Sequence, residues 1–306
     1  MKPGEQARGL MDLITAGSVD WQAMPAPFES FSYPGFDFDV PVGRDAYRQA
    51  LVARFPTERR AIERYFRDIE RAAQWAGNRI AAPALPWFVA GPMRALSGSD
   101  ALPLSTTRAY LDSHFSDPLL KEVLASQWGD YGLPPAQSSF AIHAVIVQHY
   151  FDGAWYPVGG ASEIAAGARR VIESAGGRCL VNQAVSEIVL EGGRAVGVRV
   201  DTRQGEHVYF APVVVSNAGA HATFERLLPA SVSLPFRDEL KRQPPGYEVA
   251  TLYLGLKDSP VSIGLNGGNR WIYTGLDHDE LFARRAQAVR GRPVSCYLSF
   301  PSQKDP

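Results

Sequence analysis

The sequence has few cysteines and no excess of one charge, and each absence narrows what the protein can be. Only Cys179 and Cys296 occur among 306 residues, which excludes a disulfide framework and a zinc site built on cysteine. We expect both to be free, buried thiols in a reducing compartment. Lys and Arg number 31 against 32 Asp and Glu, so a broad basic surface for nucleic acid is not expected.

The sequence also lacks the apolar core of a signal peptide near Met1 and any run of about 18 apolar residues that could span a bilayer. The expected location is therefore the cytoplasm, with peripheral contact at a membrane left open. His143 and His149 are spaced so that they fall on different faces of a helix, and a metal pair is not expected. Hydrophobic residues make up 45% of the chain, enough for a sizeable core.

The first half of the sequence predicts helices after an irregular start. Residues 1–50 are rich in Pro, Gly and aromatic residues, which favours loops and short strands. Pro56 and Thr57 open a helix whose apolar residues recur at three- and four-residue spacing, and Gly77 and Asn78 should end it. Further helices are expected at 44–55, 106–114, 117–127 and 138–150, the third of these with Ser116-Asp117-Pro118 as N-cap and first turn.

The second half predicts mainly strands. A helix at 161–175 should be followed by strands at 178–181, 184–190, 195–201, 207–210 and 213–216, then by strands at 249–256, 270–274 and 294–300 and a helix at 279–289. Glu191-Gly192-Gly193-Arg194 is a tight hairpin signal. The run Val213-Val214-Val215 is typical of a strand buried on both faces. After it, Asn217-Ala218-Gly219-Ala220 should turn into a helix that continues through Leu228.

Three motifs in residues 156–228 carry a resemblance to a known family. They are Tyr156-Pro157-Val158-Gly159-Gly160 before a helix, Val185-Ser186-Glu187-Ile188 followed by Gly193-Arg194-Ala195-Val196-Gly197-Val198, and Ala211-Pro212-Val213-Val214-Val215-Ser216-Asn217-Ala218. Phe55-Pro56-Thr57-Glu58 and the closing Ser299–Pro306 segment extend the match. In this order and spacing the chain resembles the phytoene desaturase and retinol saturase branch of the amine-oxidase-like flavoproteins.

The resemblance implies an α/β fold (α+β overall), in which a two-dinucleotide-type FAD domain accompanies a mixed helix and sheet substrate domain. The implied parts are a mostly helical portion of the substrate domain at 1–150, an FAD-domain segment at 151–228, and a sheet portion of the substrate domain at 229–306. The implied activity is that of an FAD-dependent oxidoreductase acting on C–C or C=C bonds of an apolar polyene or isoprenoid-like substrate, as in carotenoid or retinoid metabolism. Desaturation, saturation and isomerisation stay open, and no catalytic residue is identified.

The same resemblance implies where a flavin cofactor would lie. The candidate cofactor contacts are Val185, Ser216, Asn217, Ala218, Gly159 and Gly160. Val185 would lay its backbone along the adenine edge, the Ser216 segment follows a strand end where ligands collect in open α/β folds, and the glycine pair would let backbone approach the flavin. The plainer alternatives are a core valine, an ordinary strand-to-helix turn, and a turn before a helix.

One departure from the family is plain, because the sequence contains no G-x-G. The family begins with a G-x-G-x-x-G loop whose amides meet the FAD pyrophosphate. We therefore expect an internal fragment without that loop or the family's C-terminal flavin segment, and an unpaired edge or open groove beside Val213–Ser216 that promotes aggregation. Two other functions stay open: a non-catalytic flavoprotein-like module that binds protein or lipid, and an unrelated α+β lipid carrier.

Residues 80–96 are apolar, broken by three prolines, and charged only at Arg94. The segment is too short to cross a bilayer, and Trp87 beside Phe88 near an arginine is typical of an interfacial anchor. The alternative is a loop that folds over the substrate domain and buries the same side chains. Exposure of Trp87 and Phe88 in one patch would favour the anchor, and their burial would favour the loop.

Overall fold

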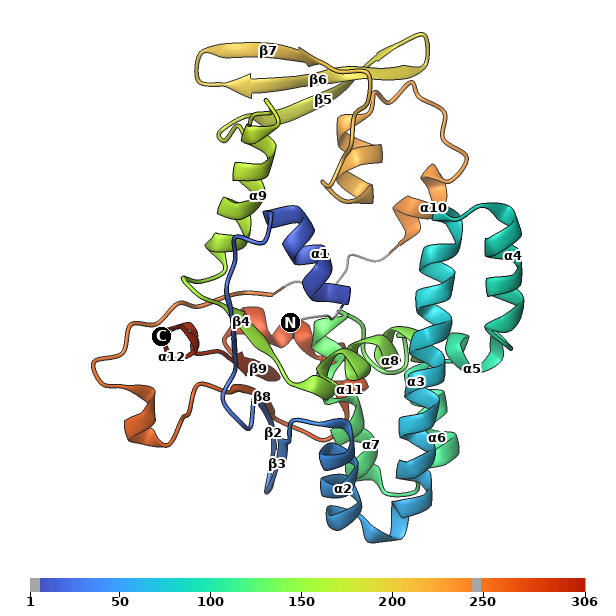
Figure 1. The fold of residues 1–306 in the computed structure, drawn as a ribbon, viewed down its shortest axis with the longest axis vertical. Helices are drawn as coiled ribbons and strands as arrows, with labels where there is room; N and C mark the ends of the chain where they lie inside the picture. The colour runs from blue at the N-terminus through green and yellow to red at the C-terminus, as the bar shows by residue number, and fades with distance from the viewer. Residues whose placement is uncertain (1–5, 244–248, 306) are drawn as a thin grey trace. The chain divides into compact units, whose positions relative to one another are not determined.

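The structure is a computed structural model that describes residues 6–243 and 249–305. The chain divides into two compact units, Met1–Ala168 with Tyr247–Pro306, and Arg169–Gly246. We call them unit 1 and unit 2. Helices predominate and three small sheets accompany them, so the fold is mixed α/β as expected (Figure 1). Among the described residues, no helix is both long and apolar enough to cross a membrane.

The main sheet of unit 1 joins the two ends of the sequence. Its order is β3-β2-β8-β9, formed by β2 (Glu29–Tyr33), β3 (Phe36–Val40), β8 (Asn269–Tyr273) and β9 (Ser295–Leu298). β2 and β8 pair in parallel, and the other neighbours pair antiparallel. The strands expected at 270–274 and 294–300 are thereby confirmed. A second, two-stranded sheet pairs β1 (Trp21–Ala23) with β4 (Trp155–Pro157).

The strand expected at 249–256 does not form. Leu252, Tyr253 and Leu254 are consecutive and all exposed, so no face of this segment is buried. The apolar sequence favours a strand, but a strand is stable only when a neighbour pairs with its backbone. Among the described residues none does so, and the prediction is wrong for that reason.

The core of unit 1 lies between one face of the main sheet and a group of helices. Phe31 and Tyr33 on β2 belong to the same apolar cluster as Tyr65 and Phe66 on α3 and Phe140 on α8. The longer helices of unit 1 are α1 (Gln6–Thr15), α2 (Arg44–Arg54), α3 (Arg59–Ala81), α4 (Trp87–Leu96), α6 (Thr107–His114), α7 (Pro118–Ala125), α8 (Phe140–His149) and α11 (His278–Ala283). Short helices are α5 (Ala101–Leu104) and α12 (Pro301–Lys304), with 3-10 turns at Pro56–Glu58, Ala82–Ala84, Ser126–Asp130, Tyr150–Asp152, Pro260–Ile263 and Arg285–Arg290.

Most helices of the first half occur where the sequence predicts them. Asp117 caps α7 as expected, because its side chain accepts a 3.0 Å hydrogen bond from the Leu120 amide. Two predictions fail. Residues 6–15 form α1 rather than loop, and α3 continues past Gly77 and Asn78 to Ala81. Tertiary hydrogen bonds hold this extra turn, since Asn78 Nδ2 donates to Ser97 Oγ at 3.0 Å.

Unit 2 contains an antiparallel sheet of β5 (Ala184–Glu191), β6 (Arg194–Thr202) and β7 (Gly205–Phe210), in that order. The hairpin expected between β5 and β6 is confirmed, with Gly192 and Gly193 at φ of 56° and 79° in the turn. Two glycines suit it because a tight hairpin turn needs positive φ at both central residues. The division between the units falls within α9 (Ser162–Ser174), which matches the helix expected at 161–175.

The strands expected at 178–181 and 213–216 do not form in unit 2. Val213 and Val215 are exposed, because a strand buried on both faces needs neighbours that the described part of unit 2 does not provide. The helix expected after Asn217 forms as a π-helix, Ala222–Leu227, and α10 (Arg237–Arg242) follows. Both cysteines are exposed rather than buried, since Cys179 lies in the unpaired 178–181 segment and Cys296 on the edge strand β9.

Candidate functional site

Ser216 and Asn217 line a hollow of about 520 Å³ within unit 2. Its other lining residues are Ile188, Ala195, Val214, Gly219, Ala220, Thr223, Phe224 and Leu228, contributed by β5, β6 and the segment that contains the π-helix. The Oγ of Ser216 lies 2.6 Å from the Oγ1 of Thr223, so two hydroxyls meet at the edge of an otherwise apolar wall. Of the 213–216 segment, Val214 and Ser216 are among the lining residues.

The π-helix is the part of this hollow that the sequence did not indicate. It places Thr223 and Phe224 in the wall, and π-helical turns occur frequently at functional sites because the extra residue redirects side chains. The turn before it contains Gly219 at a φ of 81°, a conformation that favours glycine. Of the candidate contacts, only Ser216 and Asn217 lie in the lining, and Ala218 sits between Asn217 and Gly219.

Val185 lies elsewhere in unit 2, on β5. Its side chain is 41% exposed, and the register of β5 against β6 shifts between Val185 and Glu187. Its neighbour Ala184 borders a second hollow of about 600 Å³, whose other lining residues are Asn182, Gln183, Asp201, Thr202 and Arg203. The structure therefore leaves Val185 outside the Ser216 hollow. A bulged, exposed position keeps its backbone open on one side.

Gly159 and Gly160 lie in unit 1, at the turn before α9. Their φ angles are 85° and 89°, so both positions need glycine. The Gly159 amide donates a 2.8 Å hydrogen bond to Oδ1 of Asp305, and the Gly160 amide donates to the Pro157 carbonyl at 3.0 Å. The turn is thus fastened to the segment that follows α12, and both amides already have acceptors within the protein.

The six candidate cofactor contacts are divided between the two units. A pyrophosphate needs several free backbone amides at a helix N-terminus, whereas the amides of Gly159 and Gly160 are taken by protein acceptors. The Ser216 hollow, which belongs to unit 2, offers two hydroxyls and one amide side chain. Among the described residues, no group of three or more His, Cys, Asp and Glu could hold a metal ion.

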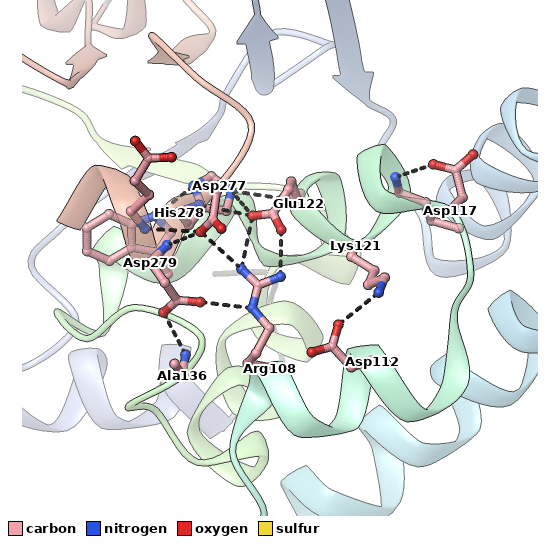
Figure 2. A network of polar contacts seen from close by, with 12 residues as sticks. Arg108, Asp112, Asp117, Lys121, Glu122, Ala136, Asp277, His278 and Asp279 are labelled. Carbon is pink, nitrogen blue, oxygen red and sulfur yellow. Dashed lines mark hydrogen bonds and ion pairs between the residues drawn. The ribbon is translucent and has the colours of Figure 1, made fainter. Parts of the chain in front are cut away.

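An ion-pair network in unit 1 is the clearest polar cluster of the molecule (Figure 2). Arg108 of α6 donates from Nη1 to Glu122 Oε1 at 2.6 Å and from Nε to Asp279 Oδ2 at 2.8 Å. Glu122 also accepts a 3.1 Å hydrogen bond from the His278 amide. Because Glu122 belongs to α7 and His278 and Asp279 to α11, one guanidinium ties three helices together. The network is structural rather than catalytic, since its groups satisfy one another.

His278 lies fully buried beside this network. Trp128 Nε1 can only donate, so the 3.1 Å contact makes His278 Nδ1 an acceptor and leaves the ring proton on Nε2. Nε2 then lies 3.0 Å from the Glu122 carbonyl oxygen and can donate to it. Burial lowers the pKa of His278 to about 4, so the ring is neutral at physiological pH. His278 is therefore a neutral core residue whose two ring nitrogens both take part in hydrogen bonds.

His143 is likewise a core residue. Burial lowers its pKa to about 3, and its two ring nitrogens lie 2.8 Å from the Tyr65 hydroxyl and 3.2 Å from the Tyr131 hydroxyl. His149 is exposed, whereas His143 is fully buried, so the two histidines do not form a metal pair.

A second buried acid is Glu29 on β2, which sequence reasoning did not identify. Burial raises its pKa to about 7, and nearby Asp130 adds to the effect. Its carboxylate accepts hydrogen bonds from Trp271 Nε1 at 2.7 Å and from Gln127 Nε2 at 2.6 Å. Lys304 donates instead to Asn269 and Ser299, and its charge lowers the Glu29 pKa only in part. No local signal could reveal this pair, because Trp271 lies at the opposite end of the sequence.

Some known proteins are similar to this chain along its entire length, although no family model matches it. Over the whole length of this chain, it is 31% identical to the all-trans-retinol 13,14-reductase of Rattus norvegicus, and the match covers 50% of that rat protein. It is 29% identical to an inactive all-trans-retinol 13,14-reductase of Danio rerio, over 97% of this chain and 52% of that protein. A neurosporene-forming phytoene desaturase of Cereibacter sphaeroides is 47% identical over 25% of this chain and 14% of its own length. The chain spans about half the length of the curated retinol reductases that it matches.

Proposed function

Since the chain belongs to the phytoene desaturase and retinol saturase-like family of oxidoreductases, we propose that it works in an FAD-dependent enzyme that adds or removes hydrogen at C–C or C=C bonds of an apolar polyene. The similarity to the rat retinol reductase over the whole chain is the observation that carries this proposal. The names of two relatives contain retinol and phytoene, and both of these are long conjugated or isoprenoid molecules. The substrate class follows from what these two molecules share.

Residues 1–150 and 229–306 are the proposed substrate domain, and the segment at 151–228 is the proposed contribution to the FAD domain. In unit 1, β2 from the first part pairs with β8 from the second, and Trp271 and Tyr273 of β8 belong to the same core as Phe31 and Tyr33. Six residues are the proposed cofactor contacts, namely Val185, Ser216, Asn217, Ala218, Gly159 and Gly160. The chain's own share of the work is to bind and orient the substrate and exclude water, since a bound flavin carries the redox chemistry.

A non-catalytic flavoprotein-like module remains the second proposal. It is favoured by one observation: the inactive relative from Danio rerio is nearly as similar to this chain as the rat enzyme is. Sequence similarity of this degree does not separate the two functions. An unrelated lipid carrier would need a closed apolar cavity in the 30–150 and 245–300 segments. Aromatic side chains such as Phe31, Tyr65 and Phe140 instead pack there, fully buried, in one apolar cluster.

The proposal can be tested by expressing this chain together with any coding sequence that flanks it in its gene. We expect a yellow protein with a flavin absorption spectrum that converts retinol or phytoene to a product differing by one or more pairs of hydrogen atoms, measured by mass spectrometry. Bound flavin without conversion of either substrate would support the module. A colourless protein that does not take up FAD on reconstitution would refute both.

The candidate contacts can be tested in the same preparation. Thr223→Trp would place an indole in the Ser216 hollow, and we expect weaker retention of FAD on gel filtration. Arg203→Trp, in the second hollow of unit 2, is the matched control. Equal flavin content in the two variants would remove Ser216, Asn217 and Ala218 from the proposed contacts.

The proposed partner of the whole protein is a membrane surface, contacted peripherally through residues 80–96. The proposed substrates dissolve poorly in water and are most readily taken from lipid. Trp87 and Phe88 are 84% and 61% exposed, so the loop that would bury them is not what the structure contains.

A further inference from the structure

Residues 80–93 form an apolar tip on the α3–α4 hairpin. This stretch contains no charged side chain, and an arginine flanks it on each side, Arg79 before and Arg94 after. Ile80 at the end of α3 is 77% exposed, and Trp87 and Phe88 begin α4. Their two rings lie 6.0 Å apart, edge to face, so they form one continuous aromatic ridge.

The ridge faces away from the rest of the hairpin. α4 runs beside α3 (Figure 1). Ala90 of α4 is buried and Met93 half-buried, whereas Trp87, Phe88 and Gly91 are exposed. A helix with one buried stripe normally carries polar residues on its other face, because that face meets water. Here both faces are apolar, which is typical of a helix that meets lipid.

The hairpin is fixed in place, so the exposure of the ridge is a property of the fold. Asn78 of α3 bonds to Ser97 just after α4, and Trp75 Nε1 donates to Asp100 at 3.0 Å. Arg79 also bonds to Asp100 and stacks on the Trp75 ring. These contacts hold the C-terminal end of α4 against α3, while Trp87 and Phe88 at its N-terminal end stay exposed.

The charged residues of the α3–α4 hairpin segment at 71–99 are all basic, and the next acidic side chain along the sequence, Asp100, is bonded to Arg79. Between residues 71 and 99 the only charged side chains are Arg71, Arg79 and Arg94, and no acidic residue interrupts them. Since Arg79 is bonded to Asp100, Arg94 is the cation best placed to meet a partner. An apolar surface with a basic border complements the interface of an anionic bilayer, where acyl chains lie just below lipid phosphates.

We propose that the α3–α4 hairpin docks on anionic membranes, with Trp87 and Phe88 inserted among the acyl chains and Arg94 against lipid phosphate groups. This inference rests on the proposed membrane contact and adds to it the lipid charge and the residues that insert. α4 has ten residues, a length of about 15 Å, so it lies in the interface and does not cross the bilayer.

Vesicle sedimentation tests the docking without substrate or flavin. We expect the protein to pellet with phosphatidylcholine vesicles that contain phosphatidylserine, and at least about tenfold less binding after Trp87→Glu with Phe88→Glu. The matched control is Leu252→Glu with Tyr253→Glu, which removes another exposed apolar pair of unit 1. Equal loss in the control, or none in the Trp87 and Phe88 variant, would overturn the proposal.

Arg94 tests the lipid charge. Arg94→Glu should weaken binding to the anionic vesicles by roughly tenfold, while Arg94→Lys should leave it nearly unchanged. Equal binding of wild-type protein to pure phosphatidylcholine vesicles would contradict the anionic preference. Concentration-dependent dimers lost on Trp87→Glu, with no vesicle binding, would show that a second copy covers the ridge and would overturn the proposal.

Insertion depth provides an independent measurement. Vesicles with brominated acyl chains should quench part of the tryptophan fluorescence, and Trp87→Phe should abolish that part while keeping most of the binding. Quenching that survives Trp87→Phe would place another tryptophan in the bilayer and contradict the assignment. A protein that docks but converts no polyene would retain this inference and refute the proposed activity, so the two failures are distinguishable.

Discussion

The indole nitrogen of Trp271 donates a 2.7 Å hydrogen bond to the carboxylate of Glu29. Glu29 lies on a strand of the main sheet and is only 2% exposed. Gln127 donates to the second carboxylate oxygen. Among the described residues, Glu29 has no ion-pair partner to offset its burial. The protonated form is therefore favoured well above the ordinary pKa of a glutamate.

Glu29→Gln should make the protein relatively more stable at high pH. The folded protein holds this proton more tightly than the unfolded chain, so the contribution of Glu29 to the free energy of unfolding falls as pH rises from about 4.5 to about 7. A glutamine does not titrate, so the variant does not lose stability in this way. The free energy of unfolding of the variant minus that of wild type should therefore be larger at pH 8 than at pH 5, by up to about 3 kcal/mol. Urea unfolding of both proteins at both pH values measures the difference.

The comparison with wild type also removes the effect of the two buried histidines. Their lowered pKa values make the folded state bind fewer protons than the unfolded chain in acid, so both destabilise the protein as pH falls below about 6.5. Both are present in wild type and variant. The same stability difference at pH 5 and pH 8 would show that Glu29 titrates normally.

Gly129→Ala should destabilise unit 1 by about 1–3 kcal/mol, because a Cβ at this position would lie 2.6 Å from two carbons of the Trp271 ring. Gly77→Ala is the matched control. Its Cβ meets nothing within 4 Å on the exposed side of α3, so it should stabilise the protein by about 0.5–1 kcal/mol. Thermal unfolding compares them, and a shift of the same sign in both variants would contradict the packing argument.

Arg108→Met should cost about 3–5 kcal/mol of unfolding free energy, since it leaves the nearly buried Glu122 carboxylate without its guanidinium. Arg108→Lys should cost less, because it keeps a positive charge but cannot bond to Glu122 and Asp279 in the same geometry. A double-mutant cycle with Glu122→Met, followed in urea, measures the coupling. Coupling below about 0.5 kcal/mol would show that the pair is not a stabilising element.

Leu252→Lys with Leu254→Lys should increase the monomer fraction and the soluble yield. These residues lie in a segment with strand-forming sequence and no paired neighbour, which is a template for association. Leu13→Lys, an exposed position on helix α1, should change neither quantity. Size-exclusion chromatography over a concentration series is the measurement. Wild-type protein that stays monomeric with a cooperative melt would contradict the expected aggregation hazard.

Local signals explain which elements could be predicted from the sequence. The N-cap at Asp117 and the Gly192-Gly193 turn act within a few residues, and both occur as expected. The end of α3 depends on the bond between Asn78 and Ser97, which no helix-stop rule contains. The strands expected at 213–216 and 249–256 have the right composition, but pairing depends on neighbours elsewhere in space.

The candidate site divides in the same way. The strand-end rule led to Ser216 and Asn217, which do line a hollow. The π-helix that brings Thr223 and Phe224 to that hollow is not marked by any local pattern in the sequence. Glu29 looks like an ordinary strand residue until Trp271 packs against it from the far end of the chain. Burial of a polar side chain is a property of the assembled core.

Because β2 pairs with β8, the main sheet cannot close during synthesis until Tyr273 has left the ribosome. Unit 2 is by then complete in sequence and can fold first, whereas the edge of β2 that pairs with β8 has to wait. Tyr33 finally stacks on Tyr273, at a ring separation of 5.2 Å. Until residues 269–273 are synthesised, the nascent chain therefore carries an unpaired edge of β2, and this is the stage at which a chaperone would have most to protect.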